Sequence, residues 1–205
     1  MLILDFGSGE TCKNDIEYVY RMIDEIPPTD KEVLIKWQLF EKVGDLTPLD
    51  HDVYLDAVTY AEGRGYATGA SVFDLESLEF LLSNDPAFVK IACRQHLYPL
   101  IEKVPEDVPL VVSVPSRSLF NEVQRRYIRA KVLCCVSEYP AAPDEYEMRF
   151  TKKQLKQGIS DHTETLRLYY TYRPEVIEMH YCLTDSTGPD AAGFAIKPSG
   201  LGNVL

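Results

Sequence analysis

Eight short apolar segments recur along the chain, and turns or segments with helical periodicity separate them. They are residues 2–6, 33–39, 66–72, 88–92, 110–114, 132–136, 158–160 and 176–182. Strands that alternate with helices indicate βαβ units and a parallel sheet. Eight such units predict an α/β fold of the (β/α)8 TIM-barrel type, and 205 residues place it at the small end for this architecture. We therefore expect a single compact domain over residues 1–205.

The segments between these strands predict the outer layer of helices. Helical periodicity covers residues 14–26, 51–62, 75–82, 97–103, 119–128 and 152–156, with a shorter helix at 163–172. Asn14 and Asp74 are expected to cap two of these helices at their N-termini. No long helical pattern follows the eighth strand, and residues 197–202 resemble a turn. The barrel is therefore expected to have shortened or missing helices near its C-terminus.

Charge and apolar content narrow the range of partners. The formal net charge of -11 argues against nucleic acid or an anionic membrane, because both require a basic surface. No run of 18 apolar residues occurs, and residues 1–6 lack a basic leader, so we expect a cytoplasmic protein. Five cysteines without CxxC spacing fit reduced, buried thiols, and Cys93 is interpreted as a packing residue.

Polar side chains gather toward the C-terminal ends of the predicted strands. Side chains two residues apart share one face of a strand, so the polar series is expected inside the barrel and the apolar series against the helices. The converging residues are Asp5, Lys36, Gln38, Lys90, Ser113, Ser160, His162, Glu178 and His180. Active sites of such barrels lie at this end. The pattern therefore predicts a catalytic pocket.

The types of these residues indicate two binding functions. A buried lysine without an anion is costly, so Lys36 and Lys90 are expected to meet a phosphate and a carboxylate of a ligand. Neutral imidazoles bind divalent metals, so His162 and His180 are expected to hold one, with Glu178 or Asp161 as a further or outer group. Such a metal would polarise a carbonyl. These are the requirements for joining an enol phosphate to an aldehyde.

The ordered set of motifs resembles the N-acetylneuraminate (sialic acid) synthase family. Its pieces are ILDFG (3–7), IKWQ (35–38), SVFDLES (71–77), PAFVKI (86–91), VVS (111–113), SEYPA (137–141), SDHT (160–163), EMH (178–180) and GPD (188–190). The resemblance implies condensation of phosphoenolpyruvate with an N-acetylated sugar aldehyde such as N-acetylmannosamine. It also implies a manganese-type ion, with Mg²⁺ or Co²⁺ as alternatives, on His162 and His180.

The same resemblance assigns the remaining site residues. Lys36, Lys90, Ser113 and Ser160 would hold phosphoenolpyruvate, while Gln38, Ser137, Tyr139 and Asp190 would line the pocket and sugar site. Asp5 stands where the family has a glutamate near the reacting centre, and Asp5 and Glu178 are the expected catalytic carboxylates. Cys93 and Ser137 replace a family serine and asparagine.

The resemblance covers only the barrel and does not reach the family's C-terminal antifreeze-like domain, which covers the neighbouring subunit's site. A homodimer and a separately encoded cap domain are therefore the expected protein partners.

Each feature also has a simpler interpretation. A histidine in a strand is commonly a hydrogen-bonded core or surface residue, and we apply that interpretation to His51 and His96. Tyr139 before Pro140 fits a braced loop, and Asp190 after Gly188-Pro189 fits a stabilised turn. Two further functions therefore stay open: a related synthase that uses a different sugar aldehyde, and a non-catalytic barrel that binds sugar or phosphate.

Overall fold

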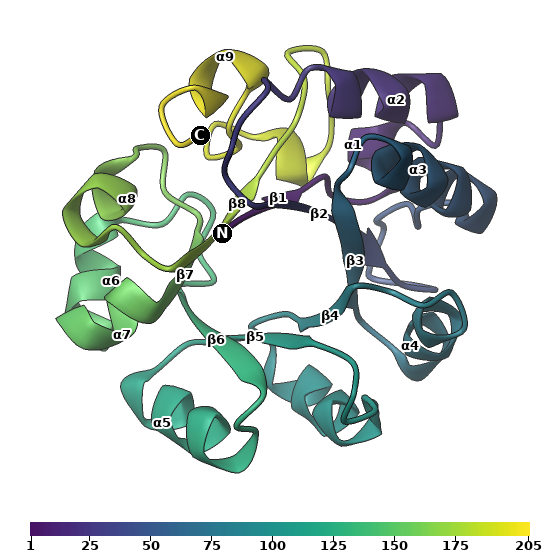
Figure 1. Ribbon diagram of the computed structural model, residues 1–205. Helices are drawn as coiled ribbons and strands as arrows, with labels where there is room; N and C mark the ends of the chain where they lie inside the picture. The colour runs from purple at the N-terminus through teal and green to yellow at the C-terminus, as the bar shows by residue number, and fades with distance from the viewer.

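Eight parallel strands close into a barrel in the computed structural model, which describes residues 1–205. The strands are β1 (Leu2–Asp5), β2 (Val33–Leu39), β3 (Ala67–Val72), β4 (Phe88–Ile91), β5 (Leu110–Val114), β6 (Ala130–Cys135), β7 (Gly158–Asp161) and β8 (Val176–His180). Each strand pairs with the next along the chain, and β8 closes the ring by pairing with β1 (Figure 1). The predicted (β/α)8 TIM barrel is confirmed.

Helices surround the strands as an outer ring (Figure 1). They are α1 (Gly9–Cys12), α2 (Ile16–Asp24), α3 (His51–Gly63), α4 (Leu75–Leu82), α5 (Arg117–Arg126), α6 (Pro143–Arg149), α7 (Lys152–Gln157), α8 (Arg167–Tyr172) and α9 (Pro198–Leu201), with the 3-10 helices η1 (Gln95–Lys103) and η2 (Pro189–Ala191). The helices after β7 are short, as predicted. None of the helices is long and apolar enough to cross a membrane.

Local chemistry explains where helix boundaries differ from the prediction. Asn14 does not cap α2, because its backbone is left-handed with φ 44°, and Asp15 caps instead through bonds from the amides of Glu17 and Tyr18. The segment predicted as a helix at 97–103 forms a 3-10 helix around Pro99, which lacks an N–H donor. Helix α6 was not predicted; it begins at Pro143, a residue favoured at the first helical position.

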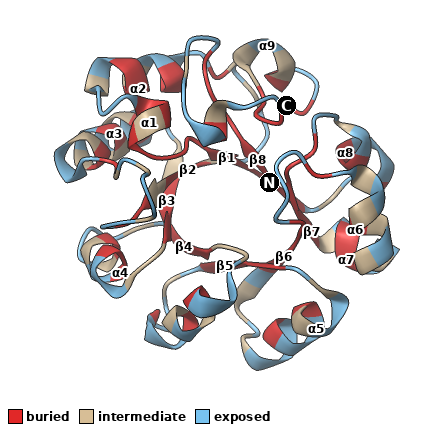
Figure 2. Ribbon diagram, turned by 180° about the vertical axis from the view of Figure 1, so that it is seen from behind, coloured by how far each residue is buried: buried red, intermediate tan, exposed pale blue.

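Two apolar layers hold the barrel together. Outward strand side chains such as Ile35 and Trp37 are buried with the helices in the main core. A second cluster lies inside the barrel and consists of Ile3, Phe88, Val111, Leu133 and Val176. Figure 2 shows the strands as an almost continuous ring of buried residues. The inner cluster forms the floor beneath the polar side chains that follow two residues later on the same strands.

Gly69 permits this floor to pack closely. A Cβ at Gly69 would lie 2.4 Å from the carbonyl oxygen of Phe88 and 2.8 Å from its ring. A larger residue on β3 would push β4 away, and with it Lys90, two residues beyond Phe88. The small residue at this position therefore supports the placement of the polar layer above it.

Candidate active site

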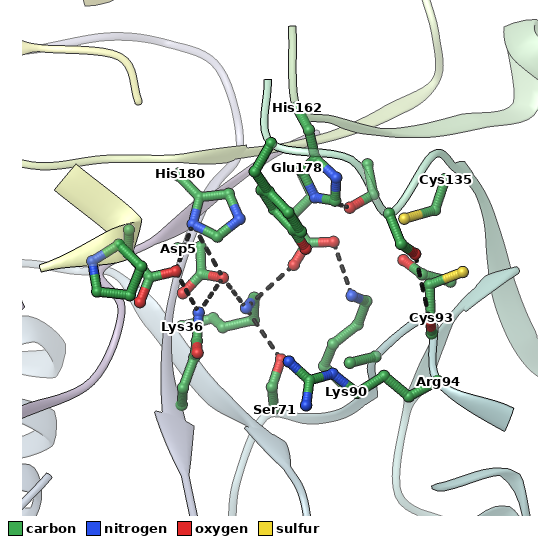
Figure 3. Close-up of a pocket in the computed structure, with 18 of the residues that line it drawn as sticks. Asp5, Lys36, Ser71, Lys90, Cys93, Arg94, Cys135, His162, Glu178 and His180 are labelled. Atoms are coloured by element: carbon green, nitrogen blue, oxygen red, sulfur yellow. Dashed lines mark hydrogen bonds and ion pairs between the residues drawn. The ribbon is translucent and has the colours of Figure 1, made fainter. Parts of the chain in front are cut away.

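A cavity of about 310 Å³ opens at the C-terminal end of the barrel (Figure 3). Twelve site residues taken from the sequence line it: Asp5, Lys36, Gln38, Lys90, Ser113, Ser137, Tyr139, Ser160, His162, Glu178, His180 and Asp190. Asp161, expected as an alternative outer group for the metal, does not line the cavity; its Oδ1 accepts from the amide of Thr163 at 2.9 Å. The twelve residues converge because strand alternation directs them inward from six strands, or because they lie in the segments that follow β6, β7 and β8. Their individual roles stay predictions.

Four charged side chains form a buried network at the base of the cavity. The Lys36 ammonium contacts Asp5 Oδ2 and lies 3.1 Å from Glu178 Oε1. The Lys90 ammonium lies 2.7 Å from Glu178 Oε2 on the opposite side (Figure 3). All four side chains are at most 4% exposed. Glu178 therefore bridges two lysines that come from β2 and β4.

This network corrects one part of the interpretation from sequence. The lysines were expected to be compensated by anions of a ligand, whereas carboxylates of the chain already offset them. Burial disfavours charge on Glu178, but Lys90 and Lys36 outweigh it and hold the pKa of Glu178 well below its usual range. Burial acts the same way on Asp5, and Lys36 and His180 lower the pKa of that carboxyl. The two carboxylates are thus ionised at neutral pH.

A second chain of contacts links the network to His180. The side-chain amide of Gln38 donates to Asp5 Oδ2 and to Asp190 Oδ1, each at 3.1 Å. His180 Nδ1 lies 3.0 Å from Asp190 Oδ1. Burial opposes charge on His180, but the carboxylates of Asp5 and Asp190 raise its pKa above the ordinary value. Asp190 therefore does more than stabilise a turn, since its carboxylate lies beside an imidazole of the pocket and accepts from Gln38.

His162 is held in the neutral form with a defined tautomer. Its Nδ1 lies 2.6 Å from the carbonyl oxygen of Val136, an acceptor, so Nδ1 must carry the proton. Burial and the nearby His180 lower the pKa of His162 to about 3. The remaining nitrogen, Nε2, is therefore an acceptor, and the hydroxyl of Ser160 lies 3.4 Å from it as the donor.

These two imidazoles fit a metal that takes part of its coordination from elsewhere. Their ring centroids lie 5.3 Å apart, and each Nδ1 lies within 3.0 Å of an oxygen. That arrangement is typical of metal-ligating histidines, which donate the second nitrogen to a carbonyl or carboxylate. No group of three or more His, Cys, Asp or Glu side chains is arranged to hold an ion. Water or ligand oxygens would have to supply the other positions.

Aromatic rings cover the imidazoles from the mouth of the cavity. Tyr139 stacks on His162 with centroids 4.3 Å apart, and Phe194 lies edge-on to His180 at 5.0 Å. Tyr139 is itself 54% exposed. The ring thus contacts the site directly and does more than brace the loop before Pro140.

The serine hydroxyls differ in what they offer a ligand. Ser113 Oγ is buried and has no hydrogen-bond partner, so it remains available to an oxygen in the cavity. Ser137 Oγ instead donates to the carbonyl oxygen of Cys93 at 3.3 Å. The hydroxyl that replaces a family amide therefore links two loops of the rim.

Sequence reasoning missed several lining residues, of which Ser71 and Arg94 bear on the chemistry. Ser71 accepts a bond of 2.9 Å from Lys36, and its position two residues after Gly69 on β3 was a usable signal. Arg94 lies at the rim, 5.3 Å from the centre of the Phe73 ring, and forms no ion pair. It follows β4 outside the alternating pattern, so only the three-dimensional structure reveals it.

Tyr146 fixes the strand that carries His162. Its hydroxyl donates to the carbonyl oxygen of Ser160 at 2.7 Å and accepts from the amide of His162 at 3.1 Å. Tyr146→Phe is expected to lower the free energy of unfolding by about 1–3 kcal/mol, because two buried backbone groups lose their partner. Urea unfolding measures this. Tyr20→Phe, which removes a hydroxyl without a hydrogen bond, is the control, and equal stability of both variants would contradict the assignment.

The fold and the cavity together define a (β/α)8 barrel with an ionised, imidazole-containing pocket at the end where such barrels carry their active sites. Residues 29–205 match the model of the NeuB family. The chain belongs to the NeuB family.

Solved structures agree with this fold. An N-acetylneuraminic acid (sialic acid) synthetase from Leptospira borgpetersenii, in complex with citrate, is 20% identical with a TM-score of 0.78, covering 99% of this chain and 80% of that one. A putative spore coat polysaccharide biosynthesis protein E from Chromobacterium violaceum is 19% identical with a TM-score of 0.78, covering 98% and 71%. A thiamine phosphate pyrophosphorylase from Pyrococcus furiosus is 10% identical with a TM-score of 0.60, covering 99% and 94%. No curated protein matches the chain.

Proposed function

We propose that this chain is a metal-dependent synthase that condenses phosphoenolpyruvate with an N-acylated sugar aldehyde resembling N-acetylmannosamine. The products are a sialic-acid-type nonulosonic acid and phosphate. One observation carries the proposal: a buried lysine–carboxylate network lies beside two imidazoles, and the Nδ1 atom of each lies within 3.0 Å of an oxygen. Membership of the NeuB family supports it.

The lysine side of the cavity suits phosphoenolpyruvate. An ammonium group carries several N–H donors, so Lys90 can hold Glu178 and still donate to a ligand oxygen. Ser113 adds a free buried hydroxyl, and Arg94 adds a cation at the rim that no carboxylate offsets. Lys36 and Lys90 are already paired with carboxylates, so they offset the negative charge of the ligand only in part. Arg94 supplies the remaining positive charge.

The imidazole side suits the aldehyde. His162 and His180 would hold the divalent ion, proposed to be Mn²⁺ with Mg²⁺ or Co²⁺ as alternatives. When bound, the ion would polarise the aldehyde carbonyl. The side chains themselves orient the ligand: Gln38 and Asp190 offer polar contacts, and Tyr139 offers an exposed ring.

The reaction balances with one water molecule. The methylene carbon of phosphoenolpyruvate attacks the aldehyde carbon, a carbon–carbon bond forms, and the aldehyde oxygen takes a proton. Water adds to the cationic C2, and the C2–oxygen bond to the phosphoryl group breaks as phosphate leaves. Glu178 stays ionised between two ammonium groups, so it holds the two lysines in place and has no proton to donate. Asp5, beside His180, faces the same cavity.

A phosphate-release assay tests the proposal. The protein is incubated with phosphoenolpyruvate, manganese and a panel of sugar aldehydes that includes N-acetylmannosamine. Release that requires both substrates supports a synthase, and the preferred sugar identifies the aldehyde. No release with any aldehyde, together with thermal stabilisation by sugar or phosphate, would establish a non-catalytic binding barrel instead.

The unpaired Arg94 favours one alternative substrate class. A cation at the rim without a carboxylate partner suits an aldehyde that carries its own anionic group, such as a phosphorylated sugar. A phosphorylated hexosamine belongs in the same panel for this reason. Preference for the phosphorylated over the neutral sugar, lost in Arg94→Ala, would select this alternative.

Lys90 is predicted to act mainly on phosphoenolpyruvate. Lys90→Ala is expected to raise the phosphoenolpyruvate concentration for half-maximal rate by roughly 10- to 100-fold, the equivalent of a charge-assisted hydrogen bond of about 1.5–3 kcal/mol. The requirement for the aldehyde should change less. Steady-state kinetics with each substrate varied in turn measures both, with the exposed Lys103→Ala as control. Unchanged phosphoenolpyruvate dependence would leave Lys90 a structural partner of Glu178.

A further inference from the structure

Two thiols lie together in the wall of the cavity, and the reaction proposed above uses neither. Cys135 is the last residue of β6, and Cys93 lies in the bend that follows β4. Both line the same cavity, on the side that holds Lys90 (Figure 3). Ser137 donates to the carbonyl oxygen of Cys93 at 3.3 Å, so the loop after β6 is in direct contact with the bend that carries Cys93.

The two thiols differ in their readiness to react. The side chain of Cys135, together with Ser137 and the positive charge of Lys90, outweighs burial and lowers the pKa of Cys93 to about 7. The contact with Cys93, together with burial, raises the pKa of Cys135 well above its ordinary value. Cys93 is partly exposed, whereas Cys135 is buried. A partly exposed thiolate next to a second thiol is the arrangement in which oxidation leads to a disulfide.

This geometry corrects the interpretation of Cys93 as a packing residue. No base lies near it in the sequence, but β6 brings a second thiol and β4 brings a lysine. The other three cysteines are buried. Cys134 points to the opposite face of β6 and packs in the main core, so it serves as the control position for Cys135.

We propose that Cys93 and Cys135 are a redox-active pair, which a peroxide entering the cavity converts to a disulfide that alters the ligand site beside Lys90. Cys93 attacks the peroxide, the O–O bond breaks, and a sulfenic acid and one water form. Cys135 then attacks the sulfenic sulfur, the S–S bond forms, and a second water leaves. A small dithiol reductant reverses the closure. The backbone at Cys93 lies outside the strand ladder, which allows the bend to adjust.

Intact mass and thiol count test the pair without reference to catalysis. The protein is treated with hydrogen peroxide, unfolded, alkylated with N-ethylmaleimide and weighed. The untreated protein should take up five labels, one for each cysteine, and the oxidised protein three, because five minus the two of the pair leaves three. Peptide mapping should find Cys93 joined to Cys135, and dithiothreitol should restore all labels. Full labelling after oxidation, or a different pairing, would overturn the proposal.

Two variants sharpen the test. Cys135→Ala should stop at the sulfenic acid of Cys93, which dimedone traps, and should form no disulfide. Cys134→Ala removes the adjacent outward thiol and should still close the pair. Closure that persists in Cys135→Ala, or that is lost in Cys134→Ala while the variant stays folded by circular dichroism, would reject Cys135 as the resolving thiol. Loss of phosphate release on oxidation, restored by dithiothreitol, would be an additional result only for an active enzyme.

Discussion

Replacing Glu178 by glutamine is expected to lower the free energy of unfolding by about 3–5 kcal/mol, as found when one partner of a buried ion pair is removed. The carboxylate of Glu178 lies between Lys36 and Lys90, and no other carboxylate forms an ion pair with Lys90. Glutamine keeps the shape but leaves the Lys90 ammonium buried without a counter-ion. Urea unfolding followed by circular dichroism measures the difference.

The pH dependence of the same variant provides an independent check. The folded state lowers the pKa of Glu178 below its ordinary 4.5, so its pairing stabilises the protein above that value and is lost as pH falls through the folded pKa. Glu178→Gln should therefore differ most from wild type at neutral pH and converge with it in acid. Glu138→Gln, at an exposed ion pair with Arg149, should change stability by less than about 1 kcal/mol. Equal effects of the two substitutions would contradict a structural role for the network.

Alanine at His162 or His180 is expected to abolish manganese binding and, with it, phosphate release. Each substitution removes one of the two imidazole nitrogens that the cavity offers, so metal affinity should fall by more than about 100-fold, the upper end of the loss seen when a group behind a ligand is removed. Isothermal titration with manganese measures affinity directly, and circular dichroism reports whether the fold is retained.

The matched control is His96→Ala, because His96 is exposed on η1 and does not line the cavity. It should bind manganese as wild type does. Unchanged manganese affinity in both His162→Ala and His180→Ala would refute the metal assignment, whatever their activity. Asp190→Asn offers an intermediate case, since it weakens the acceptor that faces His180 Nδ1 and keeps both imidazoles.

Period-two alternation explains why the barrel and its lining residues could be predicted from the sequence. Strands β2 and β5 have the same first and last residues as the apolar segments that predicted them. In β2, Ile35 and Trp37 face the helices, whereas Lys36 faces the cavity. That alternation is a property of each strand alone, so it can be recognised without knowing which strands pair with one another. The position of His180 two residues after Glu178 follows from the same rule.

Contacts between side chains on strands that are distant in the sequence could not be predicted in this way. Glu178 on β8 reaches Lys90 on β4 across the interior of the barrel, and no pattern along either strand encodes that pairing. The lysines were for that reason assigned wholly to a ligand. Cys93 and Cys135 also meet in the cavity wall from the bend after β4 and from the end of β6, and Arg94 lies between β4 and η1, outside any strand. Helix α6, which begins at Pro143, was also missed.

The apolar cluster of Ile3, Phe88, Val111, Leu133 and Val176 closes the interior of the barrel beneath the cavity, which opens at the C-terminal end of the strands. Along β8, His180 lies two residues nearer that opening than Glu178, which forms an ion pair with Lys90. A molecule bound against Lys90 must therefore enter before one bound against the imidazoles, and it must leave after that one. Two-substrate kinetics should accordingly follow a compulsory order, in which the later arrival traps the earlier one.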